Sequence, residues 1–159
     1  AMLRQANSAM QSRLQKLWEE RAPGLPFSNP YDALIFASIV EKETGRNDER
    51  ELIAAVFINR LKRGMRLQTD PTVIYGLGPA FDGNLRRRDL QTDNRYNTYT
   101  RYGLPPTPIA MPGEASIRAT LNPAKSPALY FVARGDGSHQ FSSSLVEHNR
   151  AVSKFQLRR

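Results

Sequence analysis

The sequence predicts an α+β fold that is mainly helical and carries one small antiparallel β-hairpin. Apolar residues recur at helical spacing along several separate stretches, and two strand-like runs flank Gly135-Asp136-Gly137. The chain has 159 residues, of which 40% are hydrophobic, so it suffices for one ordinary domain with its own core.

The first element is a predicted amphipathic helix over residues 3–20, which ends at the break Ala22-Pro23-Gly24-Leu25-Pro26. We therefore expect residues 1–24 to form a lead-in helix and residues 25–159 to form the main domain. The apolar stripe that defines this helix consists of Leu3, Ala6, Met10, Leu14, Leu17 and Trp18.

The second helix is expected to begin at Asn29-Pro30, because Asn is a favoured N-cap and Pro is favoured at the first helical position. It ends before Gly45, a residue type typical of the position just past a helix C-terminus. The stretch 33–40 is almost entirely apolar, so we expect this helix to be buried on most of its surface.

Two further helices are expected before a long irregular stretch. One begins near Asp48, with Glu51 placed to cap it, and ends at Gly64. The other is short, with Asp70 as its N-cap and Pro71 at its first position. Residues 76–112 are rich in Gly, Pro, Asn, Asp and Tyr, a composition typical of loops, and long loops are often functional.

The last part of the chain contains a short helix, the hairpin and a final helix. Residues 114–121 predict the short helix, which Asn122-Pro123 ends. The strand-like runs 128–133 and 139–142 enclose the Asp-Gly turn of the hairpin. Ser144 and Glu147 form the pattern of a capping box that opens the final helix.

The composition excludes several classes of function. With no cysteine and two histidines, the chain has no disulfide, thiol catalysis or cysteine metal site, and neither a metal nor a cofactor is expected. The net charge of +8 indicates an anionic partner, which could be nucleic acid, anionic lipid or a carboxylate-bearing polymer. No zinc-finger spacing or RNA-recognition signature accompanies this charge, so no nucleic-acid partner is expected.

Glu43, at the end of the buried helix, is the candidate catalytic residue. At about 100° per residue, its side chain falls on the most apolar face of the helix, whereas Glu41 falls on another side. Burial and the negative end of the helix dipole both disfavour the charged carboxylate and raise its pKa. A carboxyl group that stays protonated near neutral pH is suited to act as a general acid. The alternative is that Glu43 caps the helix end or pairs with an arginine.

Long blocks of the sequence resemble the MltG (YceG-like) endolytic murein transglycosylases, over roughly residues 25–157. The resemblance implies a lysozyme-like catalytic core and places the catalytic glutamate at the second Glu of Glu41-Lys42-Glu43-Thr44. The blocks that carry it are 37–44, 56–61, 64–76, 96–99, 103–106, the hairpin and 147–149.

The resemblance also implies a set of substrate-binding residues. By analogy with soluble lytic transglycosylases, Gln68 and Asn97 would hold the sugar or its N-acetyl group, and Tyr96 would hydrogen-bond near the acid. Each candidate also has a structural alternative, such as a helix N-cap, a stabilised turn, aromatic packing, or hydrogen bonding between the hairpin and the last helix. The other candidates are Thr69, Asp70, Thr98, Tyr99, His139 and His148.

The resemblance implies non-hydrolytic cleavage of the β-1,4 bond between N-acetylmuramic acid and N-acetylglucosamine. The enzyme would cut within glycan strands, and the product would end in 1,6-anhydromuramic acid. Peptidoglycan glycan strands and cell-wall synthases are the implied partners, and the periplasmic face of the bacterial inner membrane is the implied location. A membrane anchor is expected in the full-length protein but is absent here, because no apolar run approaches the ~20 residues that span a bilayer. This part of the protein is therefore expected to be soluble.

Other functions remain compatible with the residues. A hydrolytic muramidase needs a second carboxylate, for which Glu41, Asp70 and Asp93 are candidates. A non-catalytic glycan-binding scaffold of a cell-wall synthesis complex needs no acid at Glu43. A nucleic-acid binder is supported by the basic charge alone.

Overall fold

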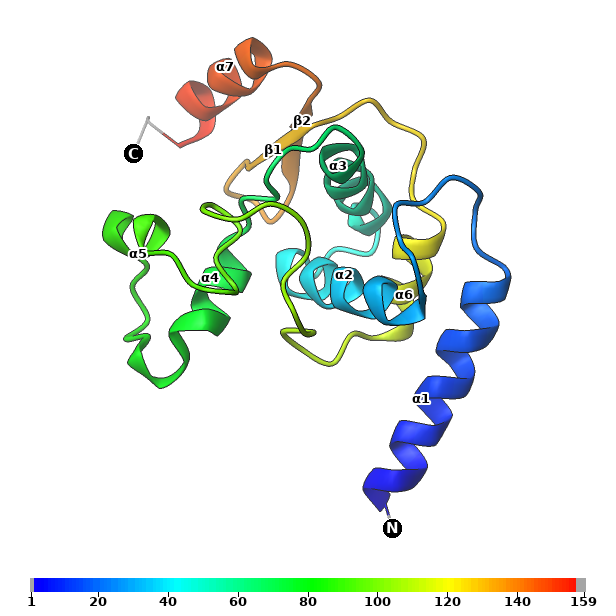
Figure 1. Ribbon diagram of the computed structural model, residues 1–159. Helices are drawn as coiled ribbons and strands as arrows, with labels where there is room; N and C mark the ends of the chain where they lie inside the picture. Colours follow the sequence, from blue (N-terminus) through cyan, green and yellow to red (C-terminus); the bar gives the residue numbers. More distant parts are fainter. Residues whose placement is uncertain (1, 157–159) are drawn as a thin grey trace.

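The structure, a computed structural model, describes the backbone of residues 2–156 and the side chains of residues 8–156. This part of the chain folds into seven α-helices, one short 3-10 helix and a two-stranded antiparallel sheet, which confirms the predicted α+β class (Figure 1). The elements are α1 (Met2–Glu19), α2 (Pro30–Glu43), α3 (Arg50–Lys62), α4 (Asp70–Leu77), η1 (Gly78–Ala80), α5 (Arg87–Gln91), α6 (Glu114–Leu121), β1 (Tyr130–Ala133), β2 (His139–Ser142) and α7 (Leu145–Phe155).

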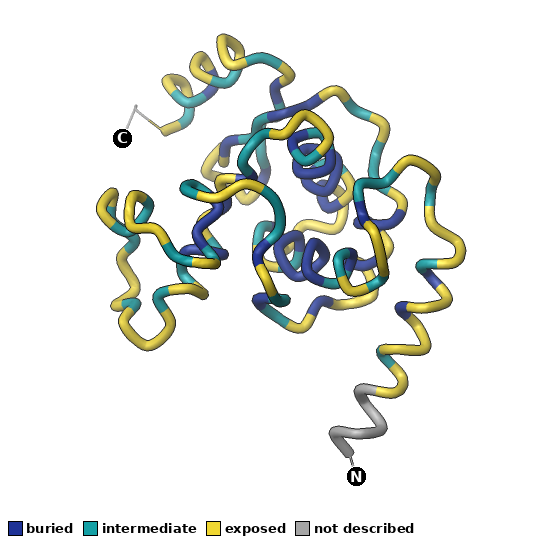
Figure 2. Tube along the Cα trace, in the orientation of Figure 1, coloured by how far each residue is buried: buried dark blue, intermediate teal, exposed yellow. Residues whose placement is uncertain are grey.

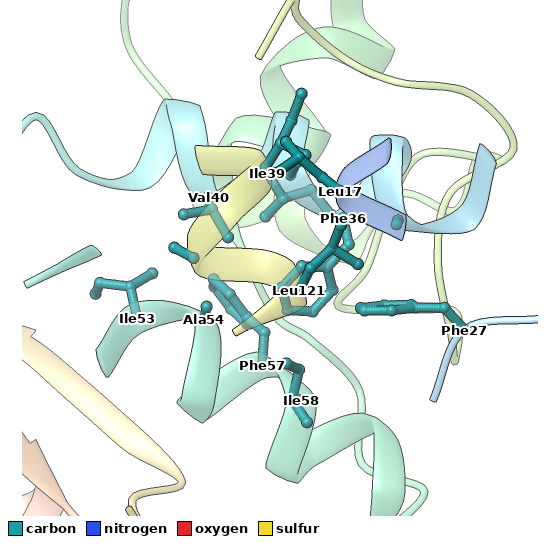
Figure 3. Packing of buried hydrophobic residues seen from close by; sticks show 14 of the residues in the cluster. Leu17, Phe27, Phe36, Ile39, Val40, Ile53, Ala54, Phe57, Ile58 and Leu121 are labelled. Carbon is teal, nitrogen blue, oxygen red and sulfur yellow. The ribbon is translucent and has the colours of Figure 1, made fainter. Parts of the chain in front are cut away.

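The core lies where α2 packs against α3 and α6, and α2 and α3 carry the longest buried stretches (Figure 2). Phe36 and Phe57 are the largest fully buried side chains, and their rings meet edge to face at 6.2 Å (Figure 3). Phe57 in turn meets Phe131 of β1 at 5.7 Å. This aromatic series fixes the hairpin against the helical core.

The predicted ends of α2 are confirmed. Asn29 caps the helix, since its Oδ1 accepts a hydrogen bond of 2.9 Å from the backbone N–H of Asp32, and Pro30 occupies the first helical position. The helix ends at Glu43 because Thr44 adopts an extended conformation. The helix is buried over 33 and 35–40, as its apolar sequence predicts.

The lead-in helix is also present as α1, which projects from one side of the molecule (Figure 1). Its last turns carry Leu14 and Leu17 into the same hydrophobic cluster as α2, with Trp18 packed beside them. Leu3 and Ala6 of the predicted stripe lie outside the described side chains. None of the helices between residues 2 and 156 combines the length and hydropathy that a bilayer crossing requires.

The hairpin and the final helix follow the prediction closely. The register pairs Tyr130 with Ser142 and Ala133 with His139, and a hydrogen bond of 2.9 Å from Arg134 N to Ser138 O closes the turn. Ser144 caps α7 by accepting a hydrogen bond of 3.2 Å from the backbone N–H of Glu147.

Two predicted helix starts are wrong. The helix α3 begins at Arg50 with Glu49 in the N-cap position, and Asp48 instead forms an ion pair with Arg46 at 2.8 Å. The helix α4 has Thr69 in the N-cap position and Asp70 as its first helical residue. In both places the predicted cap residue bonds elsewhere, and the residue now at the cap position makes no side-chain capping bond.

Candidate active site

A cleft of about 440 Å³ lies between the C-terminal end of α2 and the hairpin. The helices α2, α3 and α7, the segment 67–70, Tyr99 and the strand β1 all contribute to its wall. Seven of the predicted site residues line it: Glu43, Gln68, Thr69, Asp70, Tyr99, His139 and His148.

Glu43 is the last residue of α2 and lies half-buried in the wall of this cleft. Its Oε1 accepts a hydrogen bond of 2.7 Å from the hydroxyl of Thr69. Desolvation raises the pKa of Glu43, and the charge of Asp70 raises it further, while the Thr69 hydrogen bond and the positive charge of His139 oppose the rise. The net direction is upward, so the geometry fits a carboxyl group that holds its proton longer than an exposed glutamate.

Thr69 is held in place by two other buried threonines. Its backbone N–H donates to the hydroxyl oxygen of Thr98 at 3.0 Å, and its carbonyl accepts from the hydroxyl of Thr72 at 2.8 Å. The hydroxyls of Thr72 and Thr98 are themselves 2.8 Å apart and share a hydrogen bond. All three threonines are at most 3% exposed, so the donor to Glu43 sits on a rigid network.

Asp70 and Tyr99 form a second hydrogen-bonded pair in the cleft. The phenol of Tyr99 donates to Oδ1 of Asp70, and burial together with this bond raises the pKa of Tyr99. Tyr99 therefore remains a neutral hydrogen-bond donor near neutral pH. Asp70 is exposed and keeps its carboxylate beside Glu43.

Gln68 is the one non-glycine residue with positive φ, at 52°, within residues 2–156. This left-handed conformation costs about 1–2 kcal/mol for a residue with a Cβ. It separates Leu67 and Thr69, which are both buried, and leaves the Gln68 side chain exposed at the cleft. The strain thus coincides with a candidate substrate-binding position, as strained backbone often does at functional sites.

His139 lies at the other side of the cleft in a pair with Glu49. The carboxylate of Glu49 accepts from the backbone N–H of His139 at 2.9 Å and from its Nδ1 at 2.9 Å. Since a carboxylate can only accept, Nδ1 carries a hydrogen in this pair, and in the uncharged form of the ring Nε2 is then the acceptor. Glu49 was not a predicted site residue, because its role depends on a partner 90 positions away.

Arg60 lines the cleft, although no sequence pattern singles it out. It is 7% exposed and donates from Nε to the carbonyl of Leu129 at 2.7 Å and from Nη1 to the carbonyl of Arg66 at 2.9 Å. Its guanidinium also lies over the ring of Tyr130 at 5.0 Å. The ring of His148 stacks on the same Tyr130 ring, with the two centroids 4.9 Å apart and an interplanar angle of 20°.

Three predicted substrate-binding residues do not reach the cleft. Asn97 is fully buried, and its amide donates to three backbone carbonyls, of Asp89, Leu90 and Thr92, at 2.8–3.4 Å. Tyr96 bonds through its hydroxyl to Thr107 at 2.8 Å and not near the acid. Thr98 is buried behind Thr69, so these three residues order the loop that supports the site.

The carboxylates considered for a hydrolytic reaction are also separated by the fold. Glu41 points away from the cleft, where its Oε1 accepts from Gly113 N at 2.6 Å and from Ser116 Oγ at 3.1 Å at the start of α6. Asp93 forms an exposed ion pair with Arg101 at 3.0 Å. Only Asp70 lines the cleft with Glu43 among the three. Within the described part of the chain, no group of three or more His, Asp or Glu residues could hold a metal ion.

Comparison with known proteins shows what this chain is similar to. It is 40% identical over 155 residues to an endolytic murein transglycosylase of Bacillus subtilis, which covers 98% of this chain and 41% of the relative. A protein of the same name from Streptococcus pneumoniae is 35% identical over 128 residues, or 77% of this chain and 23% of the relative. The chain thus spans less than half the length of these relatives.

A solved structure and a family model agree with these relatives. The 2.6 Å crystal structure of a putative yceG-like protein from Listeria monocytogenes superposes with a TM-score of 0.69 and 47% identity, over 76% of this chain and 38% of that one. The model of the YceG-like family matches residues 1–154. The protein described here therefore belongs to the YceG-like family.

Proposed function

We propose that this chain is the catalytic domain of an endolytic peptidoglycan transglycosylase with Glu43 as its acid and base. The observation that supports this most strongly is the half-buried carboxyl group of Glu43, with its raised pKa, in a cleft shared with polar side chains. The curated relatives named endolytic murein transglycosylases support the reaction class.

The reaction begins with proton transfer from Glu43 to the oxygen of the β-1,4 bond between N-acetylmuramic acid and N-acetylglucosamine. The bond from muramic acid C1 to that oxygen breaks, and the N-acetylglucosamine leaves with a free hydroxyl. The Glu43 carboxylate then takes the proton of the muramic acid C6 hydroxyl, whose oxygen bonds to C1. The product ends in 1,6-anhydromuramic acid, Glu43 is protonated again, and no water is consumed.

The groups around Glu43 suit a carboxyl group that gives up a proton in the first step and takes one up in the second. The Thr69 hydroxyl donates to the carboxylate and so stabilises the form that follows proton donation. The Asp70 charge favours the protonated form that begins the cycle. We assign Gln68, Asp70, Tyr99, His139 and His148 to sugar binding, because all five line the cleft.

A hydrolytic muramidase is the second candidate, and Asp70 is the observation that favours it. A second carboxylate in the same cleft is what a hydrolytic mechanism requires to activate water or to form a covalent intermediate. Against this role, Asp70 is hydrogen-bonded to the phenol of Tyr99. The products distinguish the two reactions, since a hydrolase leaves a reducing end instead of an anhydro end.

The deciding experiment is mass spectrometry of purified peptidoglycan digested with this chain and with its Glu43→Gln variant. Anhydro-ended fragments from the wild type alone are expected. Glu41→Gln is the matched control on the same helix, because the Gln amide oxygen can still accept from Gly113 and Ser116 at the start of α6. Reducing-end fragments would identify a muramidase, and equal products from wild type and Glu43→Gln would remove Glu43 from the chemistry.

Action on peptidoglycan would place this domain outside the cytoplasm. We further propose that the full-length protein carries a membrane anchor, works at the periplasmic face of the inner membrane and acts beside cell-wall synthases. Membrane fractionation of the full-length protein and crosslinking in growing cells test these points. Recovery of the full-length protein in the soluble cytoplasmic fraction would contradict them.

A further inference from the structure

The cleft has a basic end that the proposed mechanism does not use. Arg60 is 7% exposed and lines the cleft, yet no carboxylate of the described chain lies within 4.0 Å of its guanidinium. Its hydrogen bonds go to two neutral backbone carbonyls and, at 3.4 Å, to the amide oxygen of Gln68. Desolvation lowers the pKa of Arg60, but a guanidinium stays charged near neutral pH, so a cation without a carboxylate partner lies in the wall of the cleft.

The arrangement holds this cation in one orientation. The carbonyl of Leu129, at the start of β1, fixes Nε, and the carbonyl of Arg66 fixes Nη1. Nη2 makes no hydrogen bond to any described residue, which leaves one edge of the guanidinium with donors unused. Burial of a cation without a counter-charge is costly, so an anionic ligand is the group that this position fits.

Two aromatic rings pack beside Arg60, and of these His148 lines the cleft. The ring of Tyr130 lies under the guanidinium at 5.0 Å, and the ring of His148 stacks on Tyr130. Burial and the charge of Arg60 lower the pKa of His148, so its ring is neutral near pH 7. The Nδ1 atom of His148 is buried without a hydrogen-bond partner in the described chain, which is a second unsatisfied polar group at this end of the cleft.

We propose that Arg60, with Tyr130 and His148, forms a subsite for a carboxylate carried on the muramic acid residue of the glycan strand. The proposal rests on the proposed function and adds a specificity determinant to it. N-acetylglucosamine has no carboxylate, whereas muramic acid carries one on its lactyl ether or, where a peptide stem is attached, on that stem. A carboxylate accepts charge-assisted hydrogen bonds, and the free Nη2 donors of Arg60 can supply them.

Binding to four forms of one glycan tests the subsite without relying on cleavage. The Glu43→Gln chain is titrated with stem-bearing strands and with stem-free strands that expose the lactyl carboxylate. Each is compared with the same strand after its carboxylates have been converted to methylamides. We expect the methylamide strands to bind about tenfold or more weakly than their charged parents, a loss typical of a charged hydrogen bond. The affinity of the charged strands, and not of the neutral ones, should fall with added salt.

Comparison of the charged strands identifies the source of the carboxylate. Tighter binding of stem-free strands assigns the lactyl carboxylate, and tighter binding of stem-bearing strands, lost on amidation of the stem, assigns the peptide. Equal affinity of charged and neutral strands overturns the subsite while wild-type cleavage still upholds the proposed function. No binding of any strand, with no product from the wild type, overturns both.

An Arg60→Gln variant in the same background provides an independent check. We expect it to bind charged and neutral strands alike, while Arg63→Gln, an exposed position three residues on in the sequence, keeps the preference. Persistence of the preference in a folded Arg60→Gln protein overturns the assignment. If Arg60→Gln does not fold, the comparison of charged and neutral strands on Glu43→Gln still decides the question.

Discussion

The hydrogen bond from Thr69 to Glu43 predicts how a single substitution would change the pKa of Glu43. Thr69→Val keeps the shape of the side chain and removes the one donor that reaches the Glu43 carboxylate within the described chain. Because a donated hydrogen bond stabilises the charged form, its loss raises the pKa of Glu43 above the wild-type value. The pH at which activity falls on the alkaline side should therefore move upward.

The size of this shift follows from the contact. A hydrogen bond to a charged group is worth about 1.5–3 kcal/mol, and the 2.7 Å separation is that of a well-formed bond. Glu43 is half-buried, so water replaces part of the lost stabilisation and the lower end applies. At 1.36 kcal/mol per unit, we expect a rise of about one pKa unit.

The assay is the pH dependence of kcat, paired with a carbon NMR titration of the Glu43 carboxyl group. Thr120→Val is the matched control, because it also removes a buried hydroxyl, one that donates to Ser116 O at 2.7 Å on α6. An unchanged or lowered Glu43 pKa in Thr69→Val, with the control unchanged, would refute the role given to Thr69.

Three further outcomes are expected. Glu43→Gln should raise Tm more at pH 8 than at pH 4. Folding raises the pKa of Glu43, so this carboxyl group contributes its full stability below its unfolded pKa. The wild type loses that contribution as the pH rises through the folded pKa, whereas the neutral Gln does not. An equal Tm gain at both pH values would count against the raised pKa. Asn97→Leu should lower the free energy of unfolding by about 3 kcal/mol in urea, because three carbonyls lose their donor. Unchanged stability with lost activity would instead restore Asn97 as a substrate contact. Glu49→Gln should weaken the hydrogen bond that keeps a hydrogen on Nδ1 of His139, which should change the NMR shifts of its imidazole nitrogens. It should also raise KM more than it lowers kcat. Unchanged nitrogen shifts would contradict this role of Glu49.

Local sequence signals predicted those elements whose ends depend on neighbouring residues. Asn29 and Pro30 start α2 through a bond only three residues long, and the Asp136 turn closes the hairpin through local contacts. The helix α6 has the predicted bounds, Glu114–Leu121, for the same reason. Where the signal and the contact are both local, the sequence is sufficient to predict the structure.

The site residues that were wrongly assigned or missed depend on contacts that only the folded chain makes. Glu49 occupies a cap position but bonds His139, which the fold brings from 90 positions away. Arg60 has the spacing of an ordinary polar residue on α3, and its position over Tyr130 depends on the hairpin that packs there. Asn97 matches a sugar-binding motif, yet its amide donates to backbone carbonyls of the preceding segment, those of Leu90 and Thr92. No periodicity or capping rule carries this information.

Helical geometry directs the two glutamates at the end of α2 into different environments. Glu41 and Glu43 differ by two positions, about 200° around the axis, so they cannot share a partner. Glu41 meets the start of α6, where its Oε1 accepts a hydrogen bond from the backbone N–H of the N-cap residue Gly113. Glu43 lies at the C-terminal end of its own helix, where the dipole, the desolvation and Asp70 all oppose a charge. The same residue type therefore meets two different environments on one helix: Glu41 accepts hydrogen bonds from the first residues of α6, whereas Glu43 faces the cleft, where its pKa is raised.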